Sequence, residues 1–406
     1  MKSVSEVDII LKSHSLRLAT EYCDISSSVG RVLQDSIVAD RDLPPYDRVM
    51  MDGIAISEMA LDKLNNTPLK LEGEVLAGQS RQTLKDLLKG ALLVMTGAVL
   101  PEGADIIIPK ESLRFQDDLV WVETVNNLSD QYIHRRGSDS SKGDVLISPS
   151  GRITPTEVTA LASVGIRKVK VSSKPKIAVV TTGDELVDIE DLVQEHQIRR
   201  SNGYTIAAAL KEYGYDSRSF HVFDDKNLLF DSLKDILNDY DILITTGAVS
   251  KGSVDYLPEV FKSLGLVCFL HGVAQRPGKP FWCGSTSSGK YVFALPGNPV
   301  SVMVCLYRYL LPFLERSLGI ARKEILKARI TKTISSVRPL TMFLPVVFNF
   351  NNGELMVTPQ GAKNSGDFLS LIGTDGFLEL EPGENVIEAN TLVSVYPWHF
   401  LKISSY

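Results

Sequence analysis

Residues 241 to 255, DILITTGAVSKGSVD, join a short apolar strand to a loop of small residues that ends on a carboxylate. Ile242 to Ile244 predict a buried strand, and the Thr-Thr-Gly turn after it leaves backbone N–H groups able to face an oxyanion. At the carboxyl end of a parallel strand, such a turn is typical of anion sites in α/β proteins. The stretch therefore predicts an α/β domain with an anionic ligand at its sheet edge.

The same pattern occurs twice more in this part of the chain. Ile177 to Val180 lead into TTGDE (181 to 185), and Tyr291 to Leu295 lead into PGNP (296 to 299). Because the carboxyl ends of parallel strands meet at one edge of a sheet, we expect all three loops to face one crevice. Each loop alone is equally typical of an ordinary βα turn, whereas the three together favour a binding site.

Composition excludes several classes of protein. The chain has 406 residues, 44% of them hydrophobic, and a formal net charge of −6, which predicts a globular protein of several domains without attraction to nucleic acid or anionic membranes. Its four cysteines lack CxxC spacing, which disfavours structural zinc. Acids interrupt the apolar N-terminal stretch and no apolar run is long enough for a bilayer, so we expect a cytoplasmic protein.

The texture of the sequence changes along the chain. Apolar positions at helical spacing predict a helix within residues 4 to 20, and short apolar runs between 45 and 145 predict a β-rich insertion. Thr154 is the expected cap of a further helix. After about residue 322, β-branched runs predict a small β-barrel or sandwich. Between these parts, alternating elements predict a mainly parallel sheet, with strands at 176–181, 218–223, 241–245 and 291–295 and helices at 202–213, 226–239, 256–263 and 299–317.

Three side chains in this α/β region are candidates for anion or substrate binding. Lys279, held between two prolines in RPGKP (276 to 280), is the expected cation of the crevice, although a solvated turn lysine is the alternative. Asn298 is placed either to bind a heterocycle edge or to form a turn or helix cap. Ser301 begins a helix, where its hydroxyl suits an oxyanion or a cap.

Carboxylates follow two of the loops, at Asp255 and at Asp184 with Glu185. Acids beside an anion loop repel the ligand unless a divalent cation lies between them, which favours Mg²⁺ on a phosphate or pyrophosphate. For Glu185, an ordinary acid at a helix start is the alternative. Asp52, after a diproline segment, and Asp139, after two arginines, lie in turns with the texture of sites, although either alone also fits a plain turn.

Taken together, these motifs resemble the molybdopterin molybdenumtransferases, a family that includes bacterial MoeA and the E domain of gephyrin. The resemblance covers nearly the whole chain in order. It rests on PPYDRVMMDGIA (44 to 55), MTGAVLPEGADIIIPKE (95 to 111), RRGSD (135 to 139), TTGDEL (181 to 186), RSNGY (200 to 204), TTGAVSKGSVDY (245 to 256), RPGKPFWCG (276 to 284), LPGNPVS (295 to 301) and QGAKNSGDFLSL (360 to 371).

The resemblance implies a multi-domain fold of class α/β plus β. A linking domain would comprise residues 27–45 and 146–174, a β-rich insertion 46–145, a mostly parallel α/β molybdopterin-binding domain 1–26 and 175–322, and a C-terminal β-barrel 323–406. It also implies a homodimer whose cleft combines the insertion of one subunit with the last two domains of the other. Asp52 and Asp139 would then reach the crevice across the interface.

The implied reaction takes adenylylated molybdopterin and molybdate, releases AMP with the help of Mg²⁺ and leaves molybdenum on the dithiolene. A molybdopterin adenylyltransferase would be the pathway partner. Catalytic roles fall to Asp52, Asp139, Glu185, Asp255 and Lys279, and Mg²⁺ to Glu185 and Asp255. Substrate binding falls to Thr182, Gly183, Asp184, Asn202, Gly247, Ser250, Gly252, Pro277, Gly278, Pro280, Pro296, Gly297, Asn298, Pro299, Ser301 and Ser365.

One departure concerns the barrel, where the family usually carries a GR-x-EF-x-R pattern whose first arginine contacts the oxyanion. Leu340 and Pro345 stand at the arginine positions, and Arg338 is a substitute two residues away. Lys251, in the second loop, either adds an anion contact or faces solvent. Three other functions remain open: a molybdopterin adenylyltransferase, which typically lacks the insertion and the barrel, a non-catalytic scaffold, and a paralogue that handles tungstate.

Overall fold

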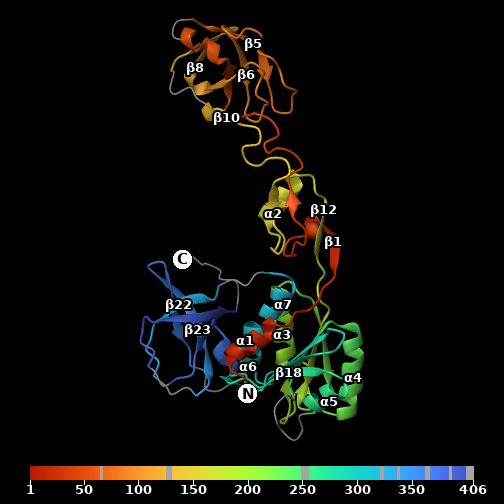
Figure 1. Ribbon diagram of the computed structural model, residues 1–406. Helices are drawn as coiled ribbons and strands as arrows, with labels where there is room; N and C mark the ends of the chain where they lie inside the picture. The colour runs from red at the N-terminus through yellow and green to blue at the C-terminus, as the bar shows by residue number, and fades with distance from the viewer. Residues whose placement is uncertain are drawn as a thin grey trace.

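The chain is elongated and built from four parts. The computed structural model describes residues 1–64, 67–124, 130–247, 256–320, 324–335, 339–361, 366–383 and 386–398. In Figure 1 a β-rich part lies at one end, a small linking part in the middle, and an α/β part beside a barrel at the other end. The sequence prediction of an α/β domain, a β-rich insertion and a C-terminal barrel is confirmed.

A six-stranded sheet forms the centre of the α/β part. Its first four strands are parallel, and the last two join through antiparallel pairings, which the sequence analysis did not predict. In spatial order the strands are β16 (Ser217–Val222), β13 (Ile177–Thr182), β17 (Ile242–Thr246), β21 (Tyr291–Leu295), β20 (Trp282–Ser285) and β18 (Val267–His271).

Helices cover both faces of this sheet because successive strand residues point to opposite sides. Ile177 and Val179 join one hydrophobic core, and Ala178 and Val180 join the other. The N-terminal helix predicted within residues 4 to 20 is short and has a capping box at Ser3. One face of the sheet carries α1 (Val4–Lys12) and α3 (Ser201–Glu212). The same face carries one continuous helical segment made of α6 (Pro299–Cys305), the π-helix η5 (Leu306–Leu310) and α7 (Leu311–Ser317). The other face carries α4 (Lys226–Asp239) and α5 (Leu257–Ser263).

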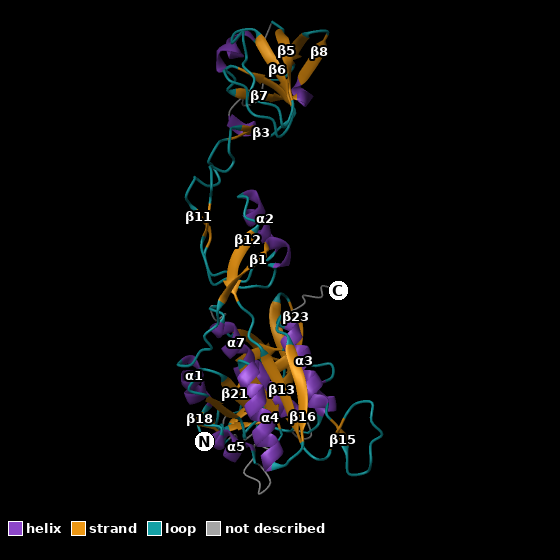
Figure 2. Cartoon of the chain, turned by 90° about the vertical axis from the view of Figure 1, so that its right-hand side faces the viewer, coloured by secondary structure: helices purple, strands orange, loops and turns teal. Residues whose placement is uncertain are grey.

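The chain order places a topological switch point in the sheet. From β13 the chain passes through α3 to β16 on one side, and then crosses through α4 to β17 on the other side of β13. Crevices at the carboxyl ends of such strands are the usual ligand sites of open α/β sheets. A small excursion, β14 (Leu186–Val187) and β15 (Ile198–Arg199), leaves the same edge and projects from the body in Figure 2.

The C-terminal strands close into a five-stranded barrel, because β23 pairs with both β24 and β25. A short strand of the α/β part, β19 (Gln275–Arg276), extends this sheet by pairing in parallel with the start of β23. The barrel strands are β22 (Leu326–Ile330), β23 (Thr341–Asn351), β24 (Glu354–Pro359), β25 (Gly376–Leu380) and β26 (Leu392–Pro397), with a 3-10 turn η6 (Phe368–Leu371).

The insertion has two hydrophobic cores of its own, one on each face of a six-stranded sheet. Its strands in spatial order are β7 (Ile106–Pro109), β4 (Gly53–Ile56), β6 (Gly90–Val94), β5 (Leu69–Val75), β9 (Leu119–Val122) and β8 (Leu113–Gln116), and η2 (Glu58–Lys63), η3 (Lys110–Ser112) and η4 (Asp130–Tyr132) are its 3-10 turns. A separate ladder joins β3 (Arg48–Val49) to β10 (Ile133–His134), where the chain enters and leaves.

The linking part pairs β1 (Thr20–Asp24) with β12 (Lys168–Ser172) and β2 (Ile37–Val38) with β11 (Val145–Ile147), and includes the 3-10 turn η1 (Ile25–Ser27). Helix α2 (Pro155–Ser163) has the predicted Thr154 cap within a capping box. Because β1 pairs with β12, residues 20–24 lie with the linking part, whereas the expected boundary at residue 26 placed them with the α/β part.

Candidate functional site

The loops after β13, β17 and β21 meet at one edge of the sheet. Gly247 has φ +104°, and a Cβ placed on it would lie 2.5 Å from the carbonyl oxygen of Thr182 and 2.8 Å from its hydroxyl. A Cβ on Gly297 would lie 3.8 Å from the Cα of Gly247. Glycine is therefore required where the second loop crosses the first. The described residues of the three loops therefore lie against one another at one edge of the sheet.

Asn202, in the first turn of α3, ties two of these loops together. Its Nδ2 donates to the carbonyl oxygen of Gly297 at 2.6 Å and to the Thr246 hydroxyl at 3.2 Å, and that hydroxyl donates to the Pro296 carbonyl at 3.0 Å. Asn202 Oδ1 and the Thr182 hydroxyl are buried and have no hydrogen-bond partner among the described residues. Buried polar atoms are rarely left unpaired, so both are available to a bound ligand.

The carboxylate of Glu185 folds back over the first loop. A Cβ on Gly183, whose φ is +142°, would lie 2.7 Å from one Glu185 carboxylate oxygen. Asp184 is engaged differently, because its Oδ1 accepts from the backbone N–H of Asp224 at 3.0 Å. Burial lowers the pKa of the neighbouring His221, so this histidine is neutral at pH 7.

Of the two residues expected to hold Mg²⁺, Glu185 lies among the described residues. Within the described ranges, no three His, Cys, Asp or Glu side chains gather closely enough to hold a metal ion. Mg²⁺ bound to phosphates needs only one or two protein carboxylates and keeps water as its other ligands. The exposed carboxylate of Glu185, beside the unpaired hydroxyl of Thr182, fits that requirement.

A cavity of about 360 Å³ continues the crevice toward the barrel. Arg276 and Lys279 are its two charged lining residues, and no described residue forms an ion pair with either. Because the lining residues are neutral or cationic, the cavity attracts an anion more than a cation. Leu340 brings an apolar side chain where the arginine of the family pattern was expected. The lining comprises Gln275, Arg276, Pro277, Gly278, Lys279, Pro280, Pro296, Gly297, Asn298, Ser301 and Leu340.

Three further predicted residues of this region lie at the start of helix α6. Asn298 stands at the N-cap position, although its side chain makes no capping hydrogen bond, and Pro299 is the first helical residue. Ser301 is 3% exposed and lines the cavity from the first turn. The structure therefore brings eight expected residues, Pro277, Gly278, Lys279, Pro280, Pro296, Gly297, Asn298 and Ser301, to one cavity.

Asp52 and Asp139 lie in a different part of the chain, at the junction of the insertion. Asp52 Oδ1 accepts from the backbone N–H and the hydroxyl of Thr96, both at 2.7 Å, and these bonds lower the pKa of Asp52. In Figure 1 the insertion stands at the far end of the molecule from the α/β part. One chain alone does not bring these two carboxylates to Glu185.

A histidine holds Asp139 in place. Arg48 donates to His134 Nδ1 at 2.9 Å, and a guanidinium can only donate. His134 therefore carries its proton on Nε2 and donates it to Asp139 Oδ1 at 2.7 Å. The side chains of His134 and Ser138 both contact Asp139 through Oδ1.

Four predicted residues lie outside the described residues. These are Ser250, Gly252 and Asp255 in the second loop, and Ser365 in the barrel. The alternative anion contacts Lys251 and Arg338 lie outside them too.

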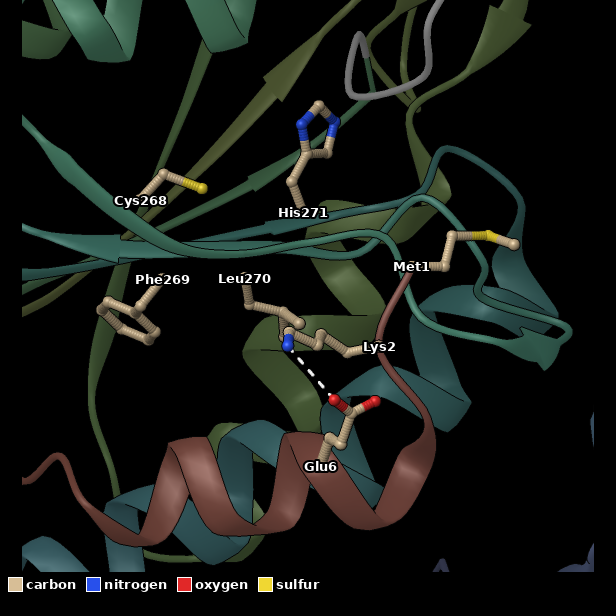
Figure 3. Close-up of a pocket in the computed structure, with 7 residues that line it drawn as sticks. All are labelled: Met1, Lys2, Glu6, Cys268, Phe269, Leu270 and His271. Carbon is tan, nitrogen blue, oxygen red and sulfur yellow. Dashed lines mark hydrogen bonds and ion pairs between the residues drawn. The ribbon is translucent and has the colours of Figure 1, made fainter.

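A second cavity, of about 370 Å³, lies between the N-terminal segment and the edge strand β18. Figure 3 shows its lysine, Lys2, paired with Glu6, and the two groups lie 3.1 Å apart. The figure also shows Cys268 and His271 on the opposite side of β18 from Phe269 and Leu270. None of the expected site residues lines this cavity, and its cation is already neutralised.

Several residues of the site were not singled out from the sequence. Arg276 belongs to the RPGKP motif that drew attention to Lys279, so the motif itself carried the signal. Thr96 and His134 are recognisable only through their bonds to Asp52 and Asp139. No local pattern distinguishes them, because the pairing joins segments 44 residues apart in one case.

Fold and site together define a multi-domain protein whose α/β domain carries glycine-rich loops at the switch point of its sheet. The models of three regions match in order: the MoeA N-terminal region (domain I and II) over residues 2–165, a probable molybdopterin binding domain over 178–316, and the MoeA C-terminal region (domain IV) over 327–398. The chain belongs to the molybdopterin molybdenumtransferase family, transferases of molybdenum cofactor biosynthesis.

Relatives cover the chain from end to end. A molybdopterin molybdenumtransferase of Synechocystis is 37% identical over 402 residues, 98% of this chain and 100% of its own length. That of a Staphylococcus epidermidis strain is 29% identical over 95% of this chain and 93% of its own. A solved molybdopterin biosynthesis MoeA protein from Pyrococcus horikoshii has a TM-score of 0.81 and 29% identity, covering 98% of this chain and 99% of that chain. Of the helices that the structure describes, none has the length and apolar character needed to span a bilayer.

Proposed function

We propose that this protein inserts molybdenum from molybdate into adenylylated molybdopterin and releases AMP in a Mg²⁺-dependent step. The observation that carries the proposal is the cavity at the α/β–barrel boundary. It presents Arg276 and Lys279 without acidic lining residues, and it opens beside the glycine-rich loops of the crevice. A doubly charged oxyanion would thus lie beside cations, and a pyrophosphate would lie in the adjoining crevice, where Mg²⁺ would offset the charges of Asp184 and Glu185.

The crevice would hold the pterin and its pyrophosphate. Thr182, Gly183, Gly247 and Gly297 supply close backbone approach, and the unpaired oxygen of Asn202 accepts a hydrogen bond from a heterocycle N–H. Together with Asp184, Pro296 and Pro299, the loop residues Ser250 and Gly252 complete this proposed surface.

The cavity would hold molybdate. Lys279, with Arg276 beside it, balances the charge of the oxyanion, while Pro277, Gly278, Pro280, Asn298 and Ser301 shape the wall. Ser365 is assigned to the same site.

Glu185 and Asp255 would hold Mg²⁺, whose chemistry there is to neutralise the charge of the pyrophosphate and of its leaving group. Asp52 and Asp139, supplied by a second copy, would orient the attacking water. The bonds from Thr96 and His134 support this role, because each fixes one carboxylate oxygen and leaves the other for water.

The wider setting follows from the same proposal. The protein would act as a homodimer in the cytoplasm and receive its substrate from a molybdopterin adenylyltransferase. The four-part division of the chain at the expected boundaries, residues 27–45 with 146–174, 46–145, 1–26 with 175–322, and 323–406, belongs to it, except that residues 20–24 pair with the linking part. The separate cores of the insertion and barrel support that division.

The test incubates purified protein with adenylylated molybdopterin, Mg²⁺ and molybdate, and follows AMP release together with metal on the pterin. Parallel reactions contain tungstate, no oxyanion, or EDTA. AMP release with molybdenum incorporation is the expected result, and EDTA should abolish it. Tight binding without release or incorporation would instead indicate a scaffold that has kept the loops and lost the chemistry.

A further inference from the structure

The turn that presents Lys279 is fastened from behind by a buried side chain, Gln275. This residue is fully buried, although glutamine is mostly found exposed. It lies in β19, directly before the turn of residues 276 to 280, which forms one wall of the oxyanion cavity. A buried primary amide must find partners for both its donor and its acceptor, so its position is informative.

Both ends of the Gln275 amide have a partner. Nε2 donates to the carbonyl oxygen of Pro277 at 3.0 Å, within the turn. Oε1 accepts from the hydroxyl of Tyr309, which belongs to the π-helix η5. Because the Pro277 carbonyl can only accept, the amide nitrogen must face the turn, and the orientation of the amide is fixed.

The space behind the turn is fully occupied. Gly278 has φ +91°, and a Cβ placed on it would lie 2.6 Å from Gln275 Nε2 and 2.8 Å from the sulfur of Cys305. Cys305 Sγ in turn lies 3.8 Å from the carbonyl oxygen of Gly278. The backbone of the turn therefore rests directly on Gln275 and Cys305, with no room to retreat from the cavity.

Tyr309 fastens the other end of the same turn. Its ring stacks on Phe281, which follows Lys279 and Pro280, with centroids 5.2 Å apart and planes 16° from parallel. Its hydroxyl reaches Gln275 at the start of the turn. Tyr309 is 1% exposed, so a single rigid residue holds both ends of the segment that carries Lys279.

We propose that Gln275 and Tyr309 are positioning residues for oxyanion binding: they hold the turn of residues 276 to 280 so that Lys279 and Arg276 face the cavity. Both act through the turn, because Gln275 borders the cavity from a fully buried position and Tyr309 lies behind it. π-helical turns inside α-helices are frequent at functional sites, and this one brings Tyr309 to the turn. The part of the proposal that concerns molybdate rests on the proposed function, whereas the fastening of the turn does not.

The experiment compares Gln275→Leu and Tyr309→Phe with wild type. Tyr309→Phe keeps the ring stacked on Phe281 and removes only the hydroxyl, so it tests the hydrogen bond with little change in packing. Tyr307→Phe is the matched control, because Tyr307 lies in the same π-helix but packs against Trp398 and Tyr213. Two quantities are measured: deuterium uptake of the peptide that contains residues 275 to 281, and the dissociation constant of molybdate by calorimetry.

We expect faster deuterium uptake in this peptide and a roughly three- to tenfold weaker molybdate affinity for Tyr309→Phe, the size of one lost hydrogen bond. Gln275→Leu should have the larger effect of the two, the KM for adenylylated molybdopterin should stay unchanged, and Tyr307→Phe should match wild type. Unchanged uptake would overturn the proposal, and so would faster uptake with unaltered molybdate affinity. If wild type itself binds no molybdate, the proposed function fails, and deuterium uptake alone then decides whether these residues hold the turn.

Discussion

The barrel and the insertion are attached to the α/β part in opposite ways. The barrel shares a hydrophobic core with it, in which Phe343, Phe377 and Trp398 pack in the same cluster as Tyr307 and Phe313. The insertion shares no such core with the α/β part among the described residues. Figure 1 shows it at the far end of the molecule, joined to the linking part by extended segments.

Charged residues repeat this contrast. At the barrel, Arg308 is 4% exposed and donates to both oxygens of Asp8 and to Glu379. At the insertion junction, Arg136 pairs with Asp42 at 2.8 Å while its own side chain remains 65% exposed. This difference shows that packing within one chain fixes the position of the barrel against the α/β part. No shared core within that chain fixes the insertion, with Asp52 and Asp139, against the α/β part among the described residues.

Loss of Arg308 should have the largest effect. Arg308→Ala leaves the carboxylates of Asp8 and Glu379 without their buried partner, and breaking such a pair typically costs about 3–5 kcal/mol. Urea unfolding measures this loss. Lys226→Ala, which removes one half of an exposed pair with Glu259, is the control and should change stability by less than about 1 kcal/mol. Equal losses in the two variants would show that the barrel is not fixed by the buried ion cluster.

Loss of Lys279 should come next. Lys279→Ala removes a charged donor from the cavity, and we expect molybdate to bind about 10- to 100-fold more weakly. Isothermal calorimetry gives the dissociation constant, and the unfolding midpoint should stay the same because Lys279 is exposed. Lys262→Ala, an exposed lysine of α5, is the matched control. Unaltered affinity in the Lys279 variant would remove this residue from the anion site.

A smaller gain is expected from Leu340→Arg. Leu340 lines the cavity, so a guanidinium there adds a third cation beside Arg276 and Lys279. Molybdate affinity should rise by up to about tenfold, the scale of one charge-assisted hydrogen bond. Leu340→Met preserves the apolar lining and serves as the control. Weaker binding by the arginine variant would mean that this wall of the cavity does not face the anion.

The smallest effect is expected at the insertion junction. Burial alone would raise the pKa of Asp47, but the Arg136 N–H and the Arg135 guanidinium outweigh burial and lower it. The stabilisation is therefore present above the unfolded pKa of about 4 and is lost as the pH falls through the lower folded value. Asp47→Asn should cost about 1 kcal/mol or less at pH 7.

Urea titrations of wild type and Asp47→Asn between pH 7 and pH 3 check this sign. The difference between the two proteins should shrink toward the acid end, and Asp62→Asn, an exposed change of the same type on η2, is the control. A difference that grows with acid would contradict the pKa direction.

Sequence alone predicted the parallel part of the sheet well, because βα turns such as TTGDE and PGNP carry local signals. It missed β18, although Leu266 to Leu270 form an apolar run, and it missed β20, which has only four residues and contains Gly284. The site was predicted where one motif supplies both loop and side chain, as with Lys279. Gln275 and His134 escaped because their contacts with Tyr309 and Arg48 join segments 34 and 86 residues apart, and no residue type or spacing marks such pairs.

The central claim is that the preformed cavity of one chain works with Asp52 and Asp139 of a second chain. Asp52→Asn and Lys279→Ala, each expected to lose most AMP release at a molybdate concentration that limits the Lys279 variant, are co-expressed with different tags and purified as a mixed population, and AMP release is measured. If the sites combine residues of two copies, statistical pairing restores about a quarter of the wild-type activity, because each mixed dimer has one intact site. If Asp52 and Lys279 act within the same chain, the mixture stays as inactive as either variant, and the claim is wrong.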